Sequence, residues 1–238
     1  SAPILNVNKP QLVSSATYTT TTVGGVGLTV SGHYGYAAMG TSGMQIFDLM
    51  KPDTISPVGS VSVSSVSQIA VAGRYAYTVH SSGGLYIFDV QNPSSPTTTA
   101  HITSGLSSPS AIFVSGKYAY VAVTDGLALV DISNPSSPYV LSTGSASPTG
   151  SGLDVYVDKG YAYVGKNTGM TIFDVSNPAA VTSVAAYSSA TNVESINVSD
   201  GYAYLVKRGG TVEILNVTNP ASPTVVGSYS VGAVLGSS

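Results

Sequence analysis

The feature that most constrains this 238-residue chain is a repeat of about 42 residues. A Tyr-x-Tyr pair recurs five times, with steps of 41, 43, 43 and 41 residues between successive copies. The pairs are Tyr34/Tyr36, Tyr75/Tyr77, Tyr118/Tyr120, Tyr161/Tyr163 and Tyr202/Tyr204. A second recurrent block follows each pair, at Ile46–Pro52, Ile87–Pro93, Leu129–Pro135, Ile172–Pro178 and Ile214–Pro220. Self-similarity at this period is the signature of a repeat architecture.

Each repeat is predicted to form four short strands. In the third repeat these are Ala111–Val114, Tyr118–Val123, Leu127–Ile132 and Tyr139–Ser142, separated by turns rich in Gly, Asp, Asn and Pro. The second and third strands are apolar at nearly every position, so both of their faces must be buried. Four-stranded sheets stacked face to face around an axis meet that requirement. The predicted fold is therefore an all-β propeller with four-stranded antiparallel blades.

Other repeat architectures fit the sequence less well. A β-helix has shorter rungs, leucine-rich and ankyrin repeats need a helical periodicity that is absent, and a β-sandwich needs no sequence repeat. The blocks G-x-Y-A-Y-V and L-x-L-V-D-I-S-N-P, clearest in Gly116–Pro135, resemble the LVIVD repeat family of β-propellers. The resemblance covers nearly the whole chain. It implies a propeller in a cell-surface or secreted protein and brings no catalytic residues with it.

Charged residues are scarce in this chain. They make up 8% of the sequence, where about 25% is typical, and the eight basic residues are scattered along it. Nucleic-acid binding needs clustered Lys and Arg, so no nucleic-acid partner is expected. No apolar run approaches the ~20 residues of a membrane span. A surface with so little charge resists self-association poorly, which fits a glycosylated protein or a subunit of an assembly.

The N-terminus carries half of a repeat. Its residues Ile4–Val7 are identical to Ile214–Val217, and Asn6 falls in register with the recurrent Asp or Asn of the second block. If Pro10 is aligned with Pro223, Leu12 and Val13 match Val225 and Val226 of the fourth strand. The chain therefore encodes five complete repeats plus an outer hairpin, which predicts a ring of five or six blades. We divide it into the half-repeat in residues 1–22 and a single propeller domain in residues 23–238.

The predicted hairpin has no partner strands within its own repeat, and an unpaired edge is a template for another chain. We expect it to complete a sheet, either in cis within the same ring or in trans on a neighbouring subunit. The remaining interpretation is that the chain is part of a longer propeller. Trans addition would be head-to-tail, and such contacts make a filament when they do not close. The candidate subunit-contact residues are Ile4, Leu5, Asn6, Val7, Leu12 and Val13.

The titratable residues do not form a recognisable site. His33, His80 and His101 lack any spacing typical of zinc ligands, and Asp154 and Asp158 lack the dense acidic spacing of a calcium loop. The sequence contains no phosphate-binding loop, no nucleophile elbow with a partnered His, and no Cys. We therefore predict no catalytic, metal or cofactor site, and a protein that is not an enzyme.

The recurrent Asp and Tyr residues are interpreted as framework. The aspartates stand near the end of the third strand, where a short acceptor can bind turn N–H groups, and an amide replaces them at Asn6 and Asn216. They are Asp48, Asp89, Asp131 and Asp174. The Tyr pairs recur in every repeat on a middle strand, which favours packing between blades over an aromatic platform for sugars.

Two N-x-[ST] sequons make Asn197 and Asn216 candidate N-glycosylation sites, although both positions are predicted to be cramped. Two functions remain open. The protein is a structural subunit of an extracellular or cell-surface assembly or filament, joined to itself through the N-terminal hairpin. Alternatively, it is a cell-surface adhesion or scaffold module that binds another protein or a glycan through loops on one propeller face. The extracellular location rests mainly on the family resemblance.

Overall fold

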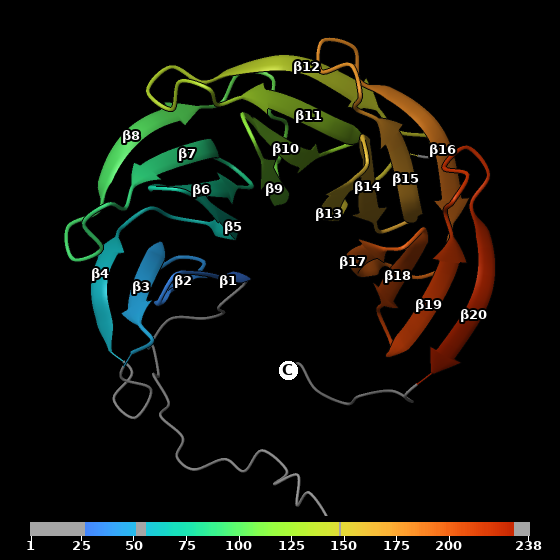
Figure 1. The fold of residues 1–238 in the computed structure, drawn as a ribbon, viewed down its shortest axis with the longest axis horizontal. Helices are drawn as coiled ribbons and strands as arrows, with labels where there is room; N and C mark the ends of the chain where they lie inside the picture. The colour runs from blue at the N-terminus through green and yellow to red at the C-terminus, as the bar shows by residue number, and fades with distance from the viewer. Residues whose placement is uncertain (1–26, 51–55, 148, 231–238) are drawn as a thin grey trace, which may run out of the picture.

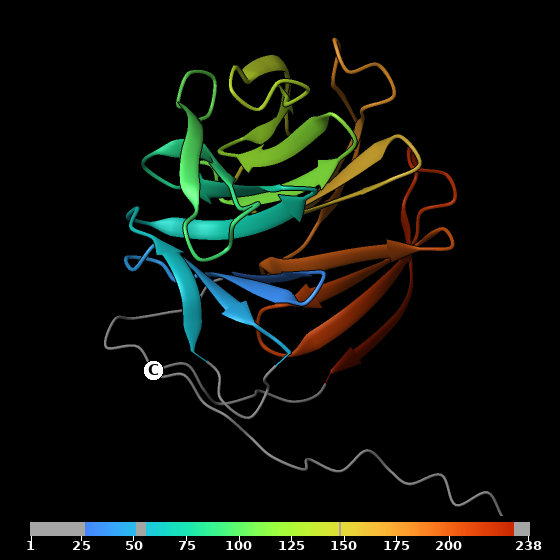
Figure 2. The same ribbon diagram turned by 60° about the vertical axis from the view of Figure 1, so that its left-hand side comes forward.

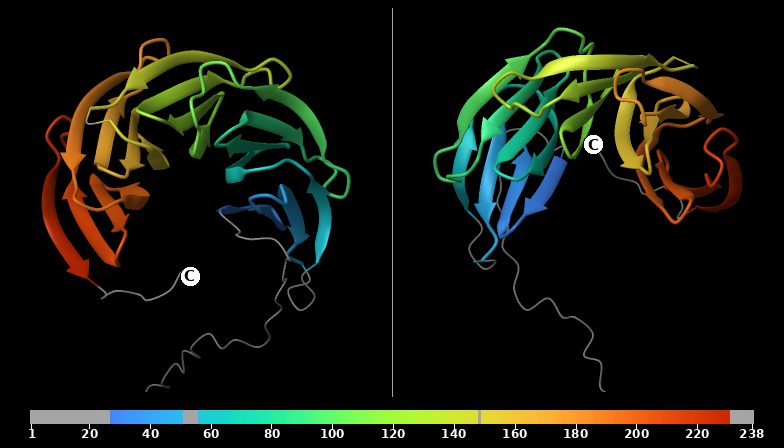
Figure 3. Two further views of the ribbon diagram at one scale, coloured as in Figure 1. Left: turned by 180° about the vertical axis from the view of Figure 1, so that it is seen from behind. Right: turned by 45° about the horizontal axis from the view of Figure 1, so that its top comes forward.

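The computed structural model describes residues 27–50, 56–147 and 149–230, so the predicted half-repeat in residues 1–22 lies outside the described residues. The described residues form twenty strands in five four-stranded antiparallel sheets. Each sheet is one blade, and the five blades stand around a common axis in an arc that is open between the first and the last (Figures 1 and 3). The predicted all-β propeller with four-stranded antiparallel blades is confirmed.

The blades follow the sequence repeats. Blade 1 comprises β1 (Gly27–Ser31), β2 (Tyr34–Ala38), β3 (Met44–Asp48) and β4 (Pro57–Val61). Blade 2 comprises β5 (Val66–Ala72), β6 (Tyr75–His80), β7 (Gly84–Asp89) and β8 (Thr97–Ile102). Blade 3 comprises β9 (Ala111–Ser115), β10 (Tyr118–Val123), β11 (Gly126–Asp131) and β12 (Tyr139–Ser145). Blade 4 comprises β13 (Gly152–Asp158), β14 (Tyr161–Lys166), β15 (Gly169–Asp174) and β16 (Thr182–Ser188). Blade 5 comprises β17 (Val193–Ser199), β18 (Tyr202–Lys207), β19 (Thr211–Asn216) and β20 (Thr224–Ser230).

In every blade the first strand lies nearest the axis and the fourth lies at the periphery (Figure 1). Each blade also contains the same irregularity, a register shift between its third and fourth strands. It falls at Ile46/Phe47, Ile87/Phe88, Leu129/Val130, Ile172/Phe173 and Ile214/Leu215. A bulge of this kind increases the local twist. The twist of the blade sheets is visible in the turned view (Figure 2).

Each blade has two different faces, which we name by the neighbour they meet. The forward face meets the following blade and carries the second tyrosine of the Tyr-x-Tyr pair. The rear face meets the preceding blade and carries an aliphatic residue of the first strand. The forward-face tyrosines are Tyr36, Tyr77, Tyr120, Tyr163 and Tyr204. The rear-face aliphatic residues are Leu28, Ile69, Ile112, Val155 and Ile196.

The hydrophobic core is divided among the four interfaces between consecutive blades. At the interface of blades 2 and 3, Tyr77 and Ile87 of the forward face lie in one cluster with Ile112 and Val130 of the rear face. The other three interfaces repeat this arrangement. A blade therefore contributes half a core on each side, and its stability depends on its neighbours, as in other repeat proteins.

The recurrent Asp residues close the turn after the third strand, as predicted. Asp131 Oδ1 accepts hydrogen bonds from the backbone N–H of Ser133 at 2.8 Å and from its hydroxyl at 2.5 Å. In blade 5, Asn216 Oδ1 accepts the same two bonds from Thr218 at 2.9 and 2.7 Å. Since the amide serves as well as the carboxylate, the position needs an acceptor and no acid–base chemistry.

Candidate functional site

The forward faces of blades 1 to 4 are covered by the blade that follows. Their tyrosines, Tyr36, Tyr77, Tyr120 and Tyr163, keep only 3–7% of their surface exposed. Burial raises the pKa of the Tyr163 hydroxyl to about 12, with the nearby Asp158 carboxylate acting in the same direction. The predicted role of these tyrosines in packing between blades is therefore what the structure shows for four of the five repeats.

The forward face of blade 5 differs, because no further described blade covers it. Tyr204 is 40% exposed, at the position where the four earlier tyrosines are buried. Tyr202 and Val206 on the same strand and Tyr229 on β20 are also exposed. The expectation that both faces of the second and third strands are buried is wrong for this face of blade 5. It is an apolar surface with the composition of a blade interface.

The rear side of blade 1 is the counterpart at the other end of the arc. Leu28 is 71% exposed, whereas the equivalent residues Ile69, Ile112, Val155 and Ile196 are only 3–5% exposed. Val30, two residues further along β1, is exposed as well. Every inner interface joins a forward face to a rear face, so the exposed residues at the two ends of the arc are of complementary type. We call the forward face of blade 5 and the rear side of β1 the end faces.

Two charged residues of blade 5, Lys207 and Glu213, lie on the side opposite to this surface. Glu213 is buried on the rear face, where its Oε2 accepts hydrogen bonds from Lys207 Nζ at 3.2 Å and from the Tyr187 hydroxyl at 2.5 Å. Burial, followed by this contact with Glu213, raises the pKa of Tyr187 to about 12. The cluster ties blade 5 to blade 4, and the three forward-facing residues of β18 remain uncharged.

Polar latches near the axis also connect neighbouring blades. The backbone N–H of Ile112 in blade 3 donates to Gln68 Oε1 of blade 2 at 2.5 Å. The backbone N–H of Ile196 in blade 5 donates to Asp154 Oδ2 of blade 4 at 2.8 Å. Gln68 Nε2 in turn donates to Asp154 Oδ1 at 3.3 Å. Sequence reasoning considered Asp154 only as a calcium ligand and missed this role, because the bond to Ile196 joins residues one repeat apart and follows no local motif.

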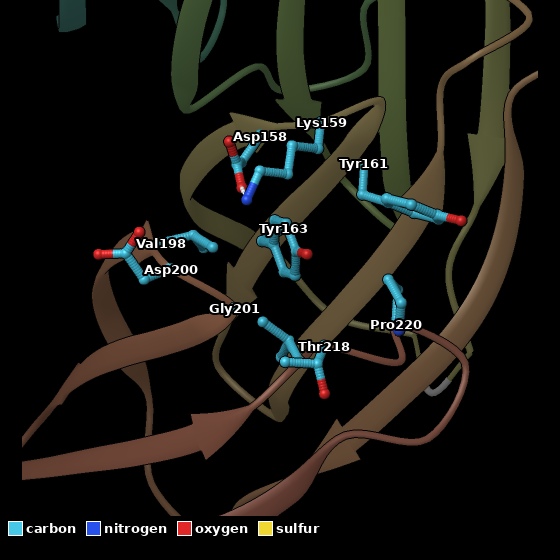
Figure 4. A pocket seen from close by; sticks show the side chains of 10 residues that line it. Asp158, Lys159, Tyr161, Tyr163, Val198, Asp200, Gly201, Thr218 and Pro220 are labelled. Carbon is cyan, nitrogen blue, oxygen red and sulfur yellow. Dashed lines mark ion pairs between the residues drawn. The ribbon is translucent and has the colours of Figure 1, made fainter.

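Two of the hollows among the described residues adjoin the strands discussed above. One, of about 370 Å³, lies along the axis between the first strands and contains the latch residues Gln68 and Asp154. The other, of about 530 Å³, lies between blades 4 and 5 and is shown in Figure 4. Tyr163 lies in the middle of the residues drawn there, and the Lys159 ammonium approaches the Asp158 carboxylate at 3.9 Å. Neither hollow gathers three or more metal-ligating side chains among the described residues.

The family model of the LVIVD repeat matches four stretches of the sequence, which together cover more than half of the chain. They are residues 64–103, 108–143, 149–189 and 190–231. The chain belongs to the LVIVD repeat family. The four matched stretches correspond to blades 2 to 5, and the resemblance inferred from the repeated sequence blocks is confirmed. None of the curated proteins matches the chain.

Three solved structures that are similar to this LVIVD-repeat protein are longer than it is. A functionally unknown protein from Desulfotomaculum acetoxidans has a TM-score of 0.74 at 13% identity, covering 90% of this chain and 74% of its own. The periplasmic gluconolactonase PpgL of Pseudomonas aeruginosa has a TM-score of 0.69 at 13% identity, with coverages of 83% and 66%. The computationally designed protein Ika8 has a TM-score of 0.67 at 9% identity, with coverages of 87% and 62%. At these identities the likeness concerns the fold.

Two of the three histidines of this LVIVD-repeat protein lie close together in blade 2, and the third lies in blade 1. His33 stands in the turn before β2, and His80 ends β6, where it is buried beside Thr78. The imidazole Nδ1–H of His80 donates to the Ser64 carbonyl at 2.7 Å, and its Nε2 accepts from the Thr78 hydroxyl at 2.9 Å. His101 lies on β8 and stacks on Tyr86. His80 also contacts Tyr86, with ring centroids 4.6 Å apart, so both histidines of blade 2 pack on the same tyrosine.

The two sequons lie in blade 5 of the LVIVD-repeat array. Asn216 is half-buried and its amide oxygen is used in the turn described above. Asn197 lies on β17 directly opposite Tyr204 of β18, and it is exposed. The expectation of a cramped position is wrong for Asn197, because no described blade follows blade 5. Glycosylation of either residue stays a prediction.

The half-repeat residues Ile4, Leu5, Asn6, Val7, Leu12 and Val13 lie outside the described residues. The described part of the chain contains no helix with the length and apolar character that a membrane crossing requires.

Proposed function

We propose that this chain is a non-catalytic structural subunit that joins other copies of itself head to tail through its end faces. The forward face of blade 5 in one copy would meet the N-terminal end of the arc, on the rear side of β1, in the next. The observation that carries the proposal is the exposure of Tyr204 and Leu28 at positions that every inner interface buries. An apolar face of this kind marks an interaction site in a soluble protein.

The contact would be heterologous, because two different surfaces meet. Heterologous contacts generate closed rings when the rotation between subunits closes and open filaments when it does not. The low charge of the chain supports either outcome, since few like charges oppose close packing of copies. We place the assembly outside the cell or on its surface, in agreement with what the family resemblance implies.

The non-catalytic part of the proposal rests on how the buried polar groups are used. His80 is held by Thr78 and the Ser64 carbonyl, and Glu213 by Lys207 and Tyr187. Each of these groups stabilises a blade or an interface between blades. One similar structure is named as a gluconolactonase, so hydrolysis of gluconolactone by the purified protein is the assay that would contradict this part.

The test of assembly is the substitution Tyr204→Arg, which places a charge in the middle of the forward face of blade 5. Tyr139→Arg is the matched control, since Tyr139 is an exposed tyrosine on the outer strand of blade 3. Light scattering after size-exclusion chromatography, with electron microscopy of the particles, should show assemblies for the unmodified chain and for Tyr139→Arg. Tyr204→Arg should elute as a monomer.

A monomeric unmodified chain would overturn the proposal. A soluble monomer that binds a protein or a glycan through its loops would instead support the adhesion or scaffold function. N-glycosylation at Asn197 and a blade docked on Tyr204 would exclude each other, because the two side chains are direct neighbours on β17 and β18. An assembly that persists with a glycan on Asn197 would therefore also contradict a contact at this face.

A further inference from the structure

The residues that cover a forward face follow a fixed pattern in the third strand of the next blade. The residue just before the recurrent Asp or Asn and the residue just after it both turn toward the preceding blade. The first set is Phe47, Phe88, Val130, Phe173 and Leu215, of which the last four are fully buried in the inner interfaces. The second set includes Val90, Ile132, Val175 and Val217, which are buried in the same interfaces.

The N-terminal half-repeat contains the same pattern. With Asn6 in the place of the recurrent Asp, Leu5 is in register with Leu215, and Val7 with Val217. Leu215 and Val217 lie in the cluster that covers the forward-face residues Tyr163 and Ile172 of blade 4. The half-repeat therefore has the side chains that a forward face requires, and the forward face of blade 5 is the one that no described blade covers.

We propose that residues 4–13 of one copy lie on the forward face of blade 5 of another copy, with Leu5 and Val7 against Tyr204 and Ile214. This inference rests on the proposed head-to-tail assembly and names the segment that makes its central contact. Ile4, the residue before Leu5, is in register with Ile172, whose side chain faces the following blade. Ile4 would thus turn to the rear side of blade 1 in its own copy, where Leu28 is exposed.

The argument for a second copy comes from the curvature of the arc. Five blades superpose together on structures of which they cover 62% to 74%. Chains of that length have room for about seven or eight blades of this size, so about two or three positions of such a ring stay open beside five blades. In our proposal the half-repeat, which precedes blade 1 in the chain, fills the position next to blade 1. The other open positions would then separate it from blade 5 of the same molecule.

Cross-linking between two introduced cysteines tests this, because the chain has no Cys of its own. One protein carries Leu5→Cys and a second carries Tyr204→Cys, and the mixed proteins are treated with a short bismaleimide. The expected result is a covalent dimer of one chain of each kind. Leu5→Cys mixed with Tyr139→Cys is the control and should give no dimer. A chain with both Leu5→Cys and Tyr204→Cys should form a ladder of covalent multimers.

A second variant tests the same contact without chemical modification. Leu5→Asp places a carboxylate in the covered position and should weaken association by about tenfold or more, as loss of a central apolar contact does. Asn8→Asp, two residues after Asn6 and outside the apolar pattern of the half-repeat, is its control and should leave association unchanged. Light scattering over a concentration series gives both values.

The outcomes separate this inference from the proposed function. If the double-cysteine chain forms only an internal cross-link, the half-repeat closes its own ring and the second copy is wrong. If assemblies depend on Tyr204 but not on Leu5, and no cross-link forms, the end faces join directly and the proposed function stands alone. If the unmodified chain is a monomer and does not cross-link between copies, both proposals fall.

Discussion

Blades 4 and 5 have almost the same sequence pattern but very different surroundings. Both carry Tyr-Ala-Tyr on the second strand and an Ile on the third strand beside it. Tyr163 in blade 4 is 3% exposed, whereas Tyr204 in blade 5 is 40% exposed. The cause is the neighbour and not the blade, since both sheets have the same four strands and the same bulge. A repeat thus specifies two adhesive faces, and only its position in the array decides whether both are used.

The polar latches show the same difference. Asp154 of blade 4 binds the backbone N–H of Ile196 in blade 5. Ser195 stands at the position of Asp154 one repeat later, and its hydroxyl donates back to Asp154 at 3.1 Å. Ser195 thus bonds back to blade 4, whereas Asp154 holds the blade that follows it.

The largest expected difference between the two blades is in their tolerance of a shortened core residue. Ile172→Ala removes a fully buried side chain between blades 4 and 5 and should cost about 2–5 kcal/mol of the free energy of unfolding. Ile214→Ala is the same change on the half-buried forward face of blade 5 and should cost about 1 kcal/mol or less. Urea denaturation at concentrations where the chain is monomeric measures both.

The same two variants are expected to affect the assembled protein differently. There Ile214→Ala should weaken association, because the partner covers Ile214 in the assembly. Equal losses of stability from Ile172→Ala and Ile214→Ala in the monomer would contradict the comparison. They would mean that the chain covers its own fifth blade.

The next difference concerns the latches. Asp154→Ala leaves the Ile196 N–H and the Ser195 hydroxyl without their acceptor and should cost about 1–3 kcal/mol. Ser195→Ala removes a donor at an exposed position and should stay within about 0.5 kcal/mol. Asp154→Asn keeps one acceptor oxygen and should fall between the two. A Ser195→Ala loss as large as that of Asp154→Ala would show that Ser195 also holds a blade.

The third difference separates blade 2 from blade 3 and depends on pH. Burial of His80 lowers its pKa below the ordinary value of about 6.5, against the opposing effect of its bond to the Ser64 carbonyl. The folded state then binds fewer protons than the unfolded state below pH 6.5. Stability should be constant above that pH and should fall as the pH drops from about 6.5 toward the lowered pKa of the folded state.

Blade 3 supplies the control, since it has Val121 and Val123 at the positions of Thr78 and His80. The double variant Thr78→Val/His80→Val gives blade 2 the residues of blade 3. It should lose the decline in stability below pH 6.5 while the decline below pH 4, which belongs to the carboxylates, remains. Thermal unfolding between pH 3 and pH 8 distinguishes the two declines. An unchanged decline near pH 6 in the double variant would assign it to another group.

The four strands of each blade can be predicted from the sequence, but the number of blades that completes the ring cannot. Periodic Tyr pairs, doubly apolar strands and Gly or Pro turns locate all four strands of a repeat, and β10 begins and ends at the predicted residues. The same rules predict Tyr204 to be buried like Tyr163. Nothing in a repeat states how many copies complete a ring, so the exposed face of blade 5 follows only from the arrangement of the blades.

Contacts between repeats are also beyond sequence reasoning. Asp154 and Ile196 are 42 residues apart, and their bond depends on how two twisted sheets lean together at the axis. The Lys207–Glu213–Tyr187 cluster likewise combines residues of two blades. Local motifs describe one strand and its turn, whereas these groups need the stacking angle of neighbouring blades. The Asp turns, by contrast, lie within three residues and were predicted correctly.

The smallest expected effect concerns those turns and compares blade 3 with blade 5. The Ser133 hydroxyl, followed by the Ser133 N–H, holds the pKa of Asp131 below its usual value. This contribution to stability is present above about pH 4 and is lost as the pH falls through the lowered pKa. Asp131→Asn copies Asn216, keeps the acceptor, and should change the free energy of unfolding at pH 7 by less than about 0.5 kcal/mol. It should also remove the contribution of Asp131 to acid denaturation. Asp131→Ala loses the acceptor and should cost about 1 kcal/mol. If Asp131→Asn is as damaging as Asp131→Ala at neutral pH, the charge itself stabilises the turn of blade 3, and Asn216 marks a real weakening of blade 5.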